Sequence, residues 1–287
     1  RGASASGNTV DLGAVTVSGS VVGGQGSTAN DNTVNLGAAH VTGNVWGGSG
    51  SATSNNTVNM NGSTTGVITV GSAGGSGNTL TVKGTNSAGN ITGFQSAIFD
   101  LGSTVTSPNA MVNLTGGAST NIDWRTLGWI GMATGARTLL SNTNGFTISN
   151  YALNGTFVSE TTTHEYFIDT DTHSDVGAKK INLDEYQFKG AAVSKSADPA
   201  ADIWAGRSKH GNTTQDNELT ITDGSTTKNA YGGHTDGTGT ANADKNDSMN
   251  NKVNLNGGTL ADVYGGYTTS AGGKATGNTV NVAGGTA

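Results

Sequence analysis

The sequence predicts an all-β protein folded as a right-handed parallel β-helix, a solenoid with coils of about 24 residues. Three observations predict it. The stretch NTVDLGAVTVSGSVVGG from Asn8 returns as NTVNLGAAHVTGNVWGG from Asn32. Apolar residues within each unit alternate at a spacing of two, which is typical of strands. Glycine accounts for 47 of the 287 residues and falls between these alternating runs, where tight turns need it.

Each unit contains three short strands, which suits one coil of a parallel β-helix better than the four-stranded blade of a propeller. The right hand follows from the strong preference of crossovers between parallel strands. Alignment of the units predicts two inward apolar ladders: Val10, Val34 and Val58, and Leu12, Leu36 and Met60. The asparagines that begin the units, Asn8, Asn32 and Asn56, are expected at a bend. There a side-chain amide can bond the next coil, and asparagine tolerates a left-handed backbone.

The domain organisation is predicted as one solenoid in three segments. Residues 1–117 form β-helix coils, and residues 118–215 form a broadened, irregular β-rich segment in which the repeat is hard to follow. Residues 216–287 form coils again, with Leu219 and Ile221 restarting the apolar ladders. Because the chain stops in the middle of a coil at Ala287, we expect a fragment of a longer protein.

The composition excludes several classes of function. The net charge is −6 with only 14 Lys and Arg residues, which argues against nucleic acid or an anionic membrane as partner. There is no cysteine, so disulfides and thiol chemistry are excluded. No apolar run approaches the roughly 20 residues of a membrane span, and the N-terminus lacks the apolar stretch of a signal peptide. Motifs of zinc proteases, phosphate loops and serine hydrolases are incomplete or missing, so no catalysis is predicted.

The units GNTVNVAGGTA and NKVNLNGGTLADVYGG, with ITGFQSAIFDLG and MVNLTGG, resemble the passenger region of large Gram-negative autotransporters. The resemblance implies a β-helical stalk at the cell surface or outside the cell, with a role in adhesion, biofilm formation or virulence. It implies that the parent protein is anchored in the outer membrane by a C-terminal translocator barrel, without membrane insertion of this segment. The implied partner is a protein or a glycan on a host or bacterial surface.

An aromatic column is the candidate binding surface. The residue before each Gly-Gly pair is Val22, Trp46, Tyr231 or Tyr264, and Tyr267 follows closely. Because the preceding residue takes the inward position, we expect these aromatic side chains to face outward and to offer stacking faces to sugars or anchors to a protein. The alternative interpretation is packing against a neighbouring loop.

One polar cluster is a candidate metal site. In IDTDTHSD, Asp169, Asp171, His173 and Asp175 recur at a spacing of two, which on a strand places them on one face. Such a set could hold Ca²⁺ or, with the histidine, a transition metal. The favoured interpretation is a solvated polar face, so no cofactor is expected.

The alternative function is a secreted polysaccharide-cleaving enzyme on the same fold, using carboxylates near residues 160–175. Glycoside hydrolysis needs two carboxylates about 5–10 Å apart. The carboxylates considered are Asp100, Asp123, Glu160, Glu165, Asp169 and Asp171. A groove that holds two carboxylates beside stacked aromatic rings would favour this enzyme.

Overall fold

The structure is a computed structural model that describes residues 3–71, 75–105, 110–116, 120–123, 126–131, 135–149, 155–172, 176–226, 228–236 and 246–287. All regular structure in these residues is β-strand, so none of them belongs to a helix that could cross a membrane. The strands stack into a parallel β-solenoid of about 9 turns with a coil spacing of about 26 residues. The predicted fold class is therefore confirmed.

Two compact units make up the chain. Unit 1 comprises Arg1–Thr156 with Phe167–Asp184, and unit 2 comprises Phe157–Tyr166 with Glu185–Ala287.

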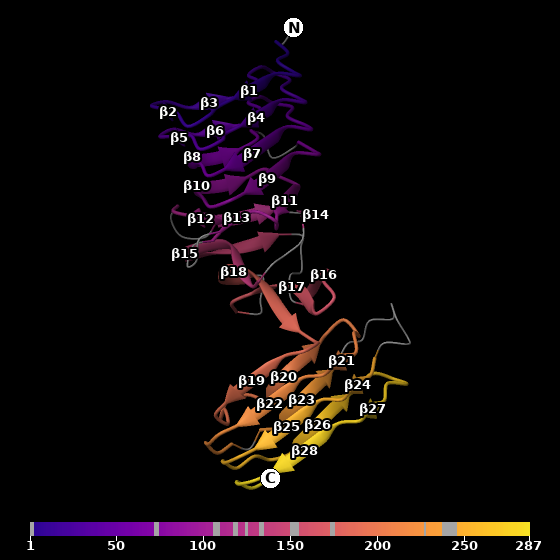
Figure 1. Ribbon diagram of the computed structural model, residues 1–287. Coiled ribbons are helices and arrows are strands. Elements are labelled where there is room, and N and C mark those ends of the chain that lie inside the picture. The colour runs from indigo at the N-terminus through magenta and orange to yellow at the C-terminus, as the bar shows by residue number, and fades with distance from the viewer. Residues whose placement is uncertain are drawn as a thin grey trace. The chain divides into compact units, whose positions relative to one another are not determined.

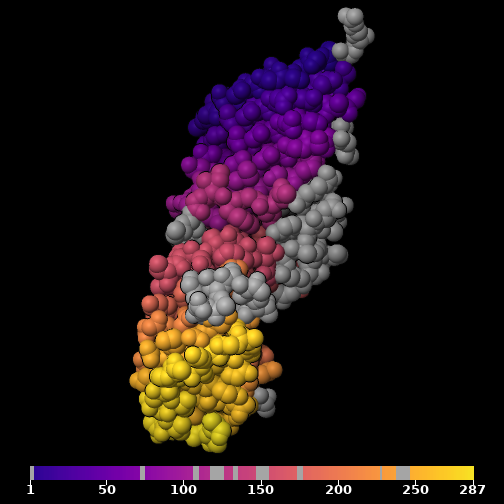
Figure 2. Space-filling view, turned by 90° about the vertical axis from the view of Figure 1, so that its right-hand side faces the viewer, coloured from indigo at the N-terminus to yellow at the C-terminus, as the bar shows by residue number. Residues whose placement is uncertain are grey.

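Unit 1 is built from parallel sheets that run along its coils (Figure 1). The first sheet contains β1 (Thr9–Asp11), β4 (Thr33–Asn35), β7 (Thr57–Asn61), β9 (Thr79–Lys83), β11 (Ser96–Asp100) and β14 (Thr126–Ile130). The second contains β2 (Thr16–Val17), β5 (His40–Val41), β8 (Thr64–Thr69), β10 (Asn86–Thr92), β12 (Val112–Leu114) and β15 (Arg137–Ser149). β3 (Val21–Val22) pairs with β6 (Val45–Trp46), and β13 (Thr120–Asp123) pairs with β15. In the space-filling view the first coils appear as successive layers in chain order, from indigo to purple (Figure 2).

The broadened segment departs from the parallel pattern. The long strand β15 pairs antiparallel with β18 (Val176–Gln187), with register shifts along the pair. β16 (Thr156–Glu160) and β17 (His164–Thr170) precede β18. Parallel strands need a crossover connection between them, and this connection gives each coil its regular length. An antiparallel pair needs no such connection, so the coil repeat cannot be followed in this segment from the sequence.

The predicted apolar ladders form the core of unit 1. Val34 aligns with Val58, and Val58 with Leu80, and all three side chains are fully buried. Each coil thus places an aliphatic side chain directly on its equivalent in the next coil, at the strand spacing of about 4.8 Å.

A second internal ladder consists of side-chain amides. Asn32 donates to Asn56 Oδ1 both from its backbone N–H (3.0 Å) and from its side chain (3.0 Å), and both residues are buried. The same contacts link Asn8 to Asn32 and Asn56 to Asn78. The expected left-handed backbone, however, belongs to the preceding residue: Asp31 has φ 56° and Asn55 has φ 55°. The ladder asparagine itself is held by its amide contacts.

Unit 2 has three parallel sheets (Figure 1). The first contains β19 (Ala192–Lys195), β22 (Glu218–Ile221), β25 (Lys252–Leu255) and β28 (Thr279–Val282). The second contains β20 (Ile203–Ser208), β23 (Ala230–Thr235) and β26 (Val263–Thr268), and the third contains β21 (Thr214–Gln215), β24 (Ser248–Met249) and β27 (Ala275–Thr276). The apolar ladder begins one coil before Leu219, because Val193 in β19 aligns with Leu219.

The Gly-Gly pairs of unit 2 mark a close approach between coils. An amide ladder joins Asn217, Asn251 and Asn278, and a Cβ atom on Gly233 would lie 2.4 Å from Asn251 Nδ2. A Cβ atom on Gly232 would lie 2.4 Å from the backbone oxygen of Gly265. Only glycine leaves room for both contacts, so the pair is required by coil stacking rather than by ligand binding.

Candidate functional site

The candidate site lies on the second sheet of unit 2, where two outward columns of side chains run across three coils. One column is Trp204, Tyr231 and Tyr264, and the next is Arg207, His234 and Tyr267. We call these six residues the aromatic platform. Their position follows from strand alternation, because the preceding residues Ile203 and Ala230 point into the core and are buried.

Ring stacking along the solenoid axis holds the platform together. Tyr231 and Tyr264 stack with their centroids 5.1 Å apart and their planes 8° apart. Tyr231 also stacks on His234, at 4.6 Å and 19°. As a result Tyr231 is only 5% exposed, so the expectation that it offers a free ring face is wrong. His234 and Tyr264 pack against the ring of Tyr231.

Tyr267 has a different orientation from the other rings. Its plane is tilted by 51° from Tyr231 and by 53° from Tyr264, and it meets His234 edge-on at 5.2 Å. Tyr267 therefore stacks face to face with none of these three rings.

The first coil of the platform contains a positively charged side chain, that of Arg207. The Arg207 guanidinium lies 4.3 Å from the centre of the Trp204 ring. Arg207 also forms an ion pair with Asp236, with Nε 3.1 Å from Oδ2. A guanidinium held between an aromatic face and a carboxylate is a favourable combination of cation–π and charge-assisted contacts.

Two carboxylates and an amide, those of Asp202, Asp262 and Asn229, border the platform at the start of its three strands. Asp202 Oδ1 accepts a hydrogen bond from the Asn229 backbone N–H (2.9 Å), and Asn229 Nδ2 donates to the Tyr231 hydroxyl (3.1 Å). Burial raises the pKa of Tyr231 above its ordinary value of 10.0, and burial together with the neighbouring Asp262 carboxylate raises the pKa of Tyr264. Both phenols thus remain neutral hydrogen-bonding groups near pH 7.

His234 is the titratable group within the stack. Burial lowers the pKa of His234 below its ordinary value of 6.5, opposed by Asp236 and Asp202 and reinforced by Arg207. Its Nε2 atom is buried and makes no hydrogen bond within the part of the chain that the structure describes. The neutral imidazole is therefore the form that fits between the rings.

This position predicts a pH effect on stability. Because the folded state resists protonation of His234 while the unfolded state accepts a proton below pH 6.5, the free energy of unfolding should fall as the pH drops through that value toward the lower folded pKa. His234→Tyr, which copies Tyr267 one coil later, should flatten this dependence. Urea unfolding from about pH 7.5 to about pH 5 measures it. The control is His40→Tyr, at an exposed position of β5; equal flattening by both variants would contradict the prediction.

Three of the four residues predicted to bind are gathered in the platform: Tyr231, Tyr264 and Tyr267. Trp46 lies in unit 1, on β6, aligned with Val22 and Thr69. Trp204, Arg207 and His234 were not predicted as site residues. Aligning DIWAGRS with NAYGGHT and DVYGGYT would have found them, but Ala205 replaces the first glycine and hides the repeat.

The chain matches no protein family model, no curated protein and no solved structure.

Glu165 is the most deeply buried of the described carboxylates in the stretch considered for catalysis. It is 0% exposed, and its Oε1 accepts from Ser208 Oγ (2.6 Å) and Asn212 Nδ2 (2.9 Å). Its Oε2 accepts from the backbone N–H groups of Lys209 (2.8 Å) and His210 (3.1 Å). Four donors thus surround this carboxylate, which connects the start of β17 to the turn after β20.

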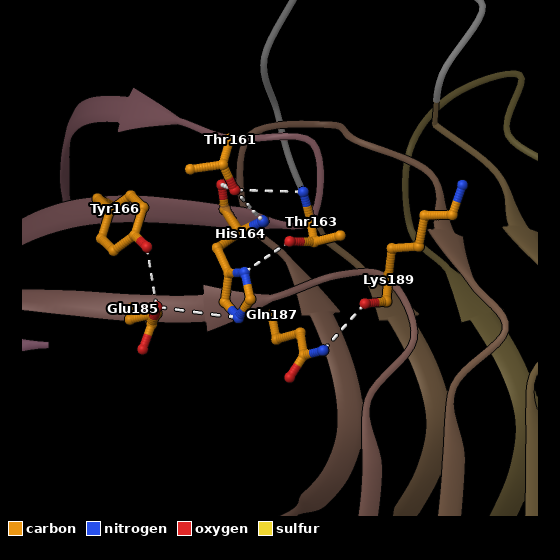
Figure 3. Close-up of polar contacts among 7 residues, drawn as sticks. All are labelled: Thr161, Thr163, His164, Tyr166, Glu185, Gln187 and Lys189. Atoms are coloured by element: carbon orange, nitrogen blue, oxygen red, sulfur yellow. Dashed lines mark hydrogen bonds and ion pairs between the residues drawn. The ribbon is translucent and has the colours of Figure 1, made fainter. Parts of the chain in front are cut away.

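A half-buried polar cluster connects β17 to β18 in unit 2 (Figure 3). The Tyr166 hydroxyl donates to Glu185 Oε1 (2.9 Å), and His164 Nε2 lies 3.8 Å from the same oxygen. On its other side, His164 Nδ1 lies 2.8 Å from Thr163 Oγ1. His164 and Glu165 are successive residues of a strand, so their side chains point to opposite faces, unlike the pair of a helical zinc protease motif.

The candidate metal ligands are only partly described. Asp169 is buried and its Oδ1 accepts from the Thr170 N–H (2.7 Å), while Asp171 is exposed and its Oδ1 accepts from the Lys179 N–H (2.9 Å). β17 ends at Thr170, so Asp171 lies in the following turn and not on the strand face that the spacing predicted. His173 and Asp175 lie outside the described residues, and the described residues contain no group of three potential metal ligands.

A groove of about 340 Å³ lies on unit 1. Its lining includes Asp11, Asn35, Asn59 and Lys83, with a single carboxylate and no aromatic side chain. It does not combine paired carboxylates with stacked rings.

Proposed function

We propose that this chain is a segment of an adhesive surface protein whose β-solenoid presents the aromatic platform to a ligand. The observation that carries the proposal is the register of the platform, in which six large side chains from three coils lie in two adjacent columns, with Tyr231 enclosed and the other five partly exposed. Coil stacking does not require them, because the outward column on the neighbouring sheet is Thr220, Asn254 and Asn281. Rings kept where the fold does not need them are typical of a binding surface.

The biological setting we propose is that of an autotransporter passenger. The segment would be displayed at the cell surface, with a translocator barrel elsewhere in the parent chain and a protein or glycan of a host or bacterial surface as partner. Support comes from the parallel β-solenoid, which is the architecture that the resemblance implies. The acidic net charge of −6 further favours a partner other than nucleic acid or anionic lipid.

The alternative, a polysaccharide-cleaving enzyme, has less support. A catalytic carboxylate must reach its substrate, whereas Glu165 is buried and surrounded by four donors from the chain itself. Non-catalytic binding is therefore the function that we propose.

Screening the full chain against glycan and surface-protein arrays tests this proposal. A ligand of the platform should lose at least about tenfold in affinity with the double variant Tyr264→Ala, Tyr267→Ala, since aromatic residues often dominate binding energy. Trp129→Ala is the matched control, because it removes a partly buried aromatic side chain of unit 1, outside the platform, and should leave the affinity unchanged. The proposal is wrong if every ligand found binds the double variant as well as the original chain.

A further inference from the structure

The groove on unit 1 follows the outward side of its first sheet. Its lining includes one column of side chains from four successive coils, Asp11, Asn35, Asn59 and Thr81, which strand pairing places in register. Each step along this column equals the strand spacing of about 4.8 Å, so the column extends over about 14 Å. Asn35, Asn59 and Thr81 are half-buried, and each lies in a strand that is paired on both sides.

The groove stays open beside this column because of a glycine turn. β7 and β9 continue to the exposed residues Asn61 and Lys83, whereas β4 ends at Asn35 and the chain turns at Gly37. Gly37 has φ 49°, and a Cβ atom there would lie 2.4 Å from the Leu12 backbone oxygen. Only glycine fits this turn, so no side chain from it occupies the groove.

The amides of the column keep hydrogen-bonding groups for a ligand. Asn59 Nδ2 donates to Asn35 Oδ1 (2.6 Å), and Asn35 Nδ2 donates to Asp11 Oδ1. A carboxamide has two N–H donors and two acceptor lone pairs, and each of these contacts uses only one of them on each amide. Asn35 and Asn59 thus each retain an N–H donor and a lone pair, one coil spacing apart.

The spacing of these groups determines which polymer fits along the column. An extended peptide turns equivalent groups to one side at every second residue, about 6.8 Å apart, which is out of step with a column of about 4.8 Å. A β-linked hexopyranose chain is an extended ribbon in which each unit advances by nearly one coil spacing. Its hydroxyl groups both donate and accept hydrogen bonds, so it matches the amide column unit by unit.

The charges along the groove favour a neutral chain. Lys83 Nζ lies 4.0 Å from Asp100 Oδ2, so this ammonium already faces a carboxylate of the protein. At the other end of the column, the exposed Asp11 carboxylate would repel an anionic polymer. The column between these two ends consists of uncharged amides and a hydroxyl.

We propose that the groove of unit 1 binds a linear, neutral, β-linked polysaccharide, with Asn35, Asn59 and Thr81 each hydrogen-bonding one sugar unit. The inference goes beyond the proposed function, because the aromatic platform belongs to unit 2 and takes no part in this second site. Each sugar unit contributes a small number of hydrogen bonds, so the affinity should grow with the number of units that the column can hold.

Isothermal titration calorimetry of the full chain with cello-oligosaccharides of two to six units tests the proposal. We expect the affinity to rise about tenfold from two units to four and little beyond, because a column over four coils holds about four units. Maltohexaose is the matched probe, since it has the same sugar and length as cellohexaose but an α-linkage that curls the chain. It should bind at least about fivefold more weakly than cellohexaose.

A pair of asparagine variants locates the site. Asn59→Ala should weaken binding of cellohexaose about fivefold, since the sugar in the middle of the column loses its partner. Asn254→Ala is the control, because Asn254 belongs to an outward amide ladder of unit 2, where it bonds Asn281 (2.9 Å), and it should leave the affinity unchanged. Circular dichroism melting of each variant shows that the fold is retained.

The double platform variant Tyr264→Ala, Tyr267→Ala separates this inference from the proposed function, and it should bind cellohexaose as well as the original chain does. Undetectable binding of cellohexaose, equal affinity for the two hexasaccharides, or equal weakening by both asparagine variants would overturn the inference. Loss of cellohexaose binding in the platform variant would also overturn it and would leave the proposed function standing. If Asn59→Ala weakens cellohexaose binding but no ligand depends on the platform, the inference stands and the proposed function fails.

Discussion

Glu165→Ala is expected to lower the free energy of unfolding of unit 2 by about 4 kcal/mol, the order typical of a broken buried charge network. The substitution removes the acceptor of four hydrogen bonds, which come from Ser208 Oγ, Asn212 Nδ2 and the N–H groups of Lys209 and His210, and only Asn212 Nδ2 keeps a second carboxylate acceptor, Glu160. Because Glu165 is 0% exposed, it also leaves a cavity that water can fill only in part. Urea unfolding followed by tryptophan fluorescence measures the loss, and Trp204 reports on unit 2.

The matched control for Glu165 is Glu160→Ala. Glu160 is exposed and receives one hydrogen bond, from Asn212 Nδ2 (2.7 Å). Its removal should cause a much smaller loss, since solvent replaces that single contact. Equal stability of the Glu165 variant and the original chain would show that this carboxylate does not hold unit 2 together, and would restore it as a candidate for chemistry.

Asn56→Ala is expected to lower the free energy of unfolding of unit 1 by about 3 kcal/mol, because several buried hydrogen bonds are lost together. Its Oδ1 accepts two bonds from Asn32, and its Nδ2 donates to the Ala29 carbonyl (2.9 Å). No water reaches these groups, since Asn56 is fully buried. Thermal unfolding monitored by circular dichroism gives the loss of stability.

Asn59→Ala is the control for the internal ladder. Asn59 lies on the same strand, β7, but on its outward face, where Nδ2 donates to Asn35 Oδ1 (2.6 Å) and solvent can compensate. Its substitution should change the stability little. If both variants lose equal stability, burial is not what makes the internal amides important.

The coil architecture could be predicted because its contacts occur at nearly constant sequence offsets. Val34 packs on Val58 and Asn32 bonds Asn56, in each case 24 residues on, so aligning the repeats also aligns the contacts. The glycine pairs could be recognised in the sequence for the same reason, whereas only the tertiary structure shows that the second glycine of each pair in unit 2 packs against the amide ladder. The antiparallel pairing of β15 with β18 broke this regularity and could not be inferred.

The candidate site was only partly predictable. Tyr231 and Tyr264 could be recognised because each directly precedes a Gly-Gly pair. Trp204 was not recognised, because Ala205 follows it in place of the first glycine. Arg207 meets Asp236 at an offset of 29 residues, and Glu165 meets Ser208 at an offset of 43, and neither offset belongs to the repeat. The burial of Tyr231 also depends on how its neighbours tilt, which no spacing encodes.

The sequence by itself determined the β-solenoid, its apolar and asparagine ladders and the absence of cysteine chemistry. These features follow from residue types repeated at a regular spacing, since each coil uses its equivalent in the next coil as its packing partner. Only the tertiary structure decided that the tyrosines join Trp204, Arg207 and His234 in one platform and that Glu165 is enclosed. The physical reason is that these contacts bring together side chains from irregular offsets, whose geometry is set by packing in space and not by the period of the chain.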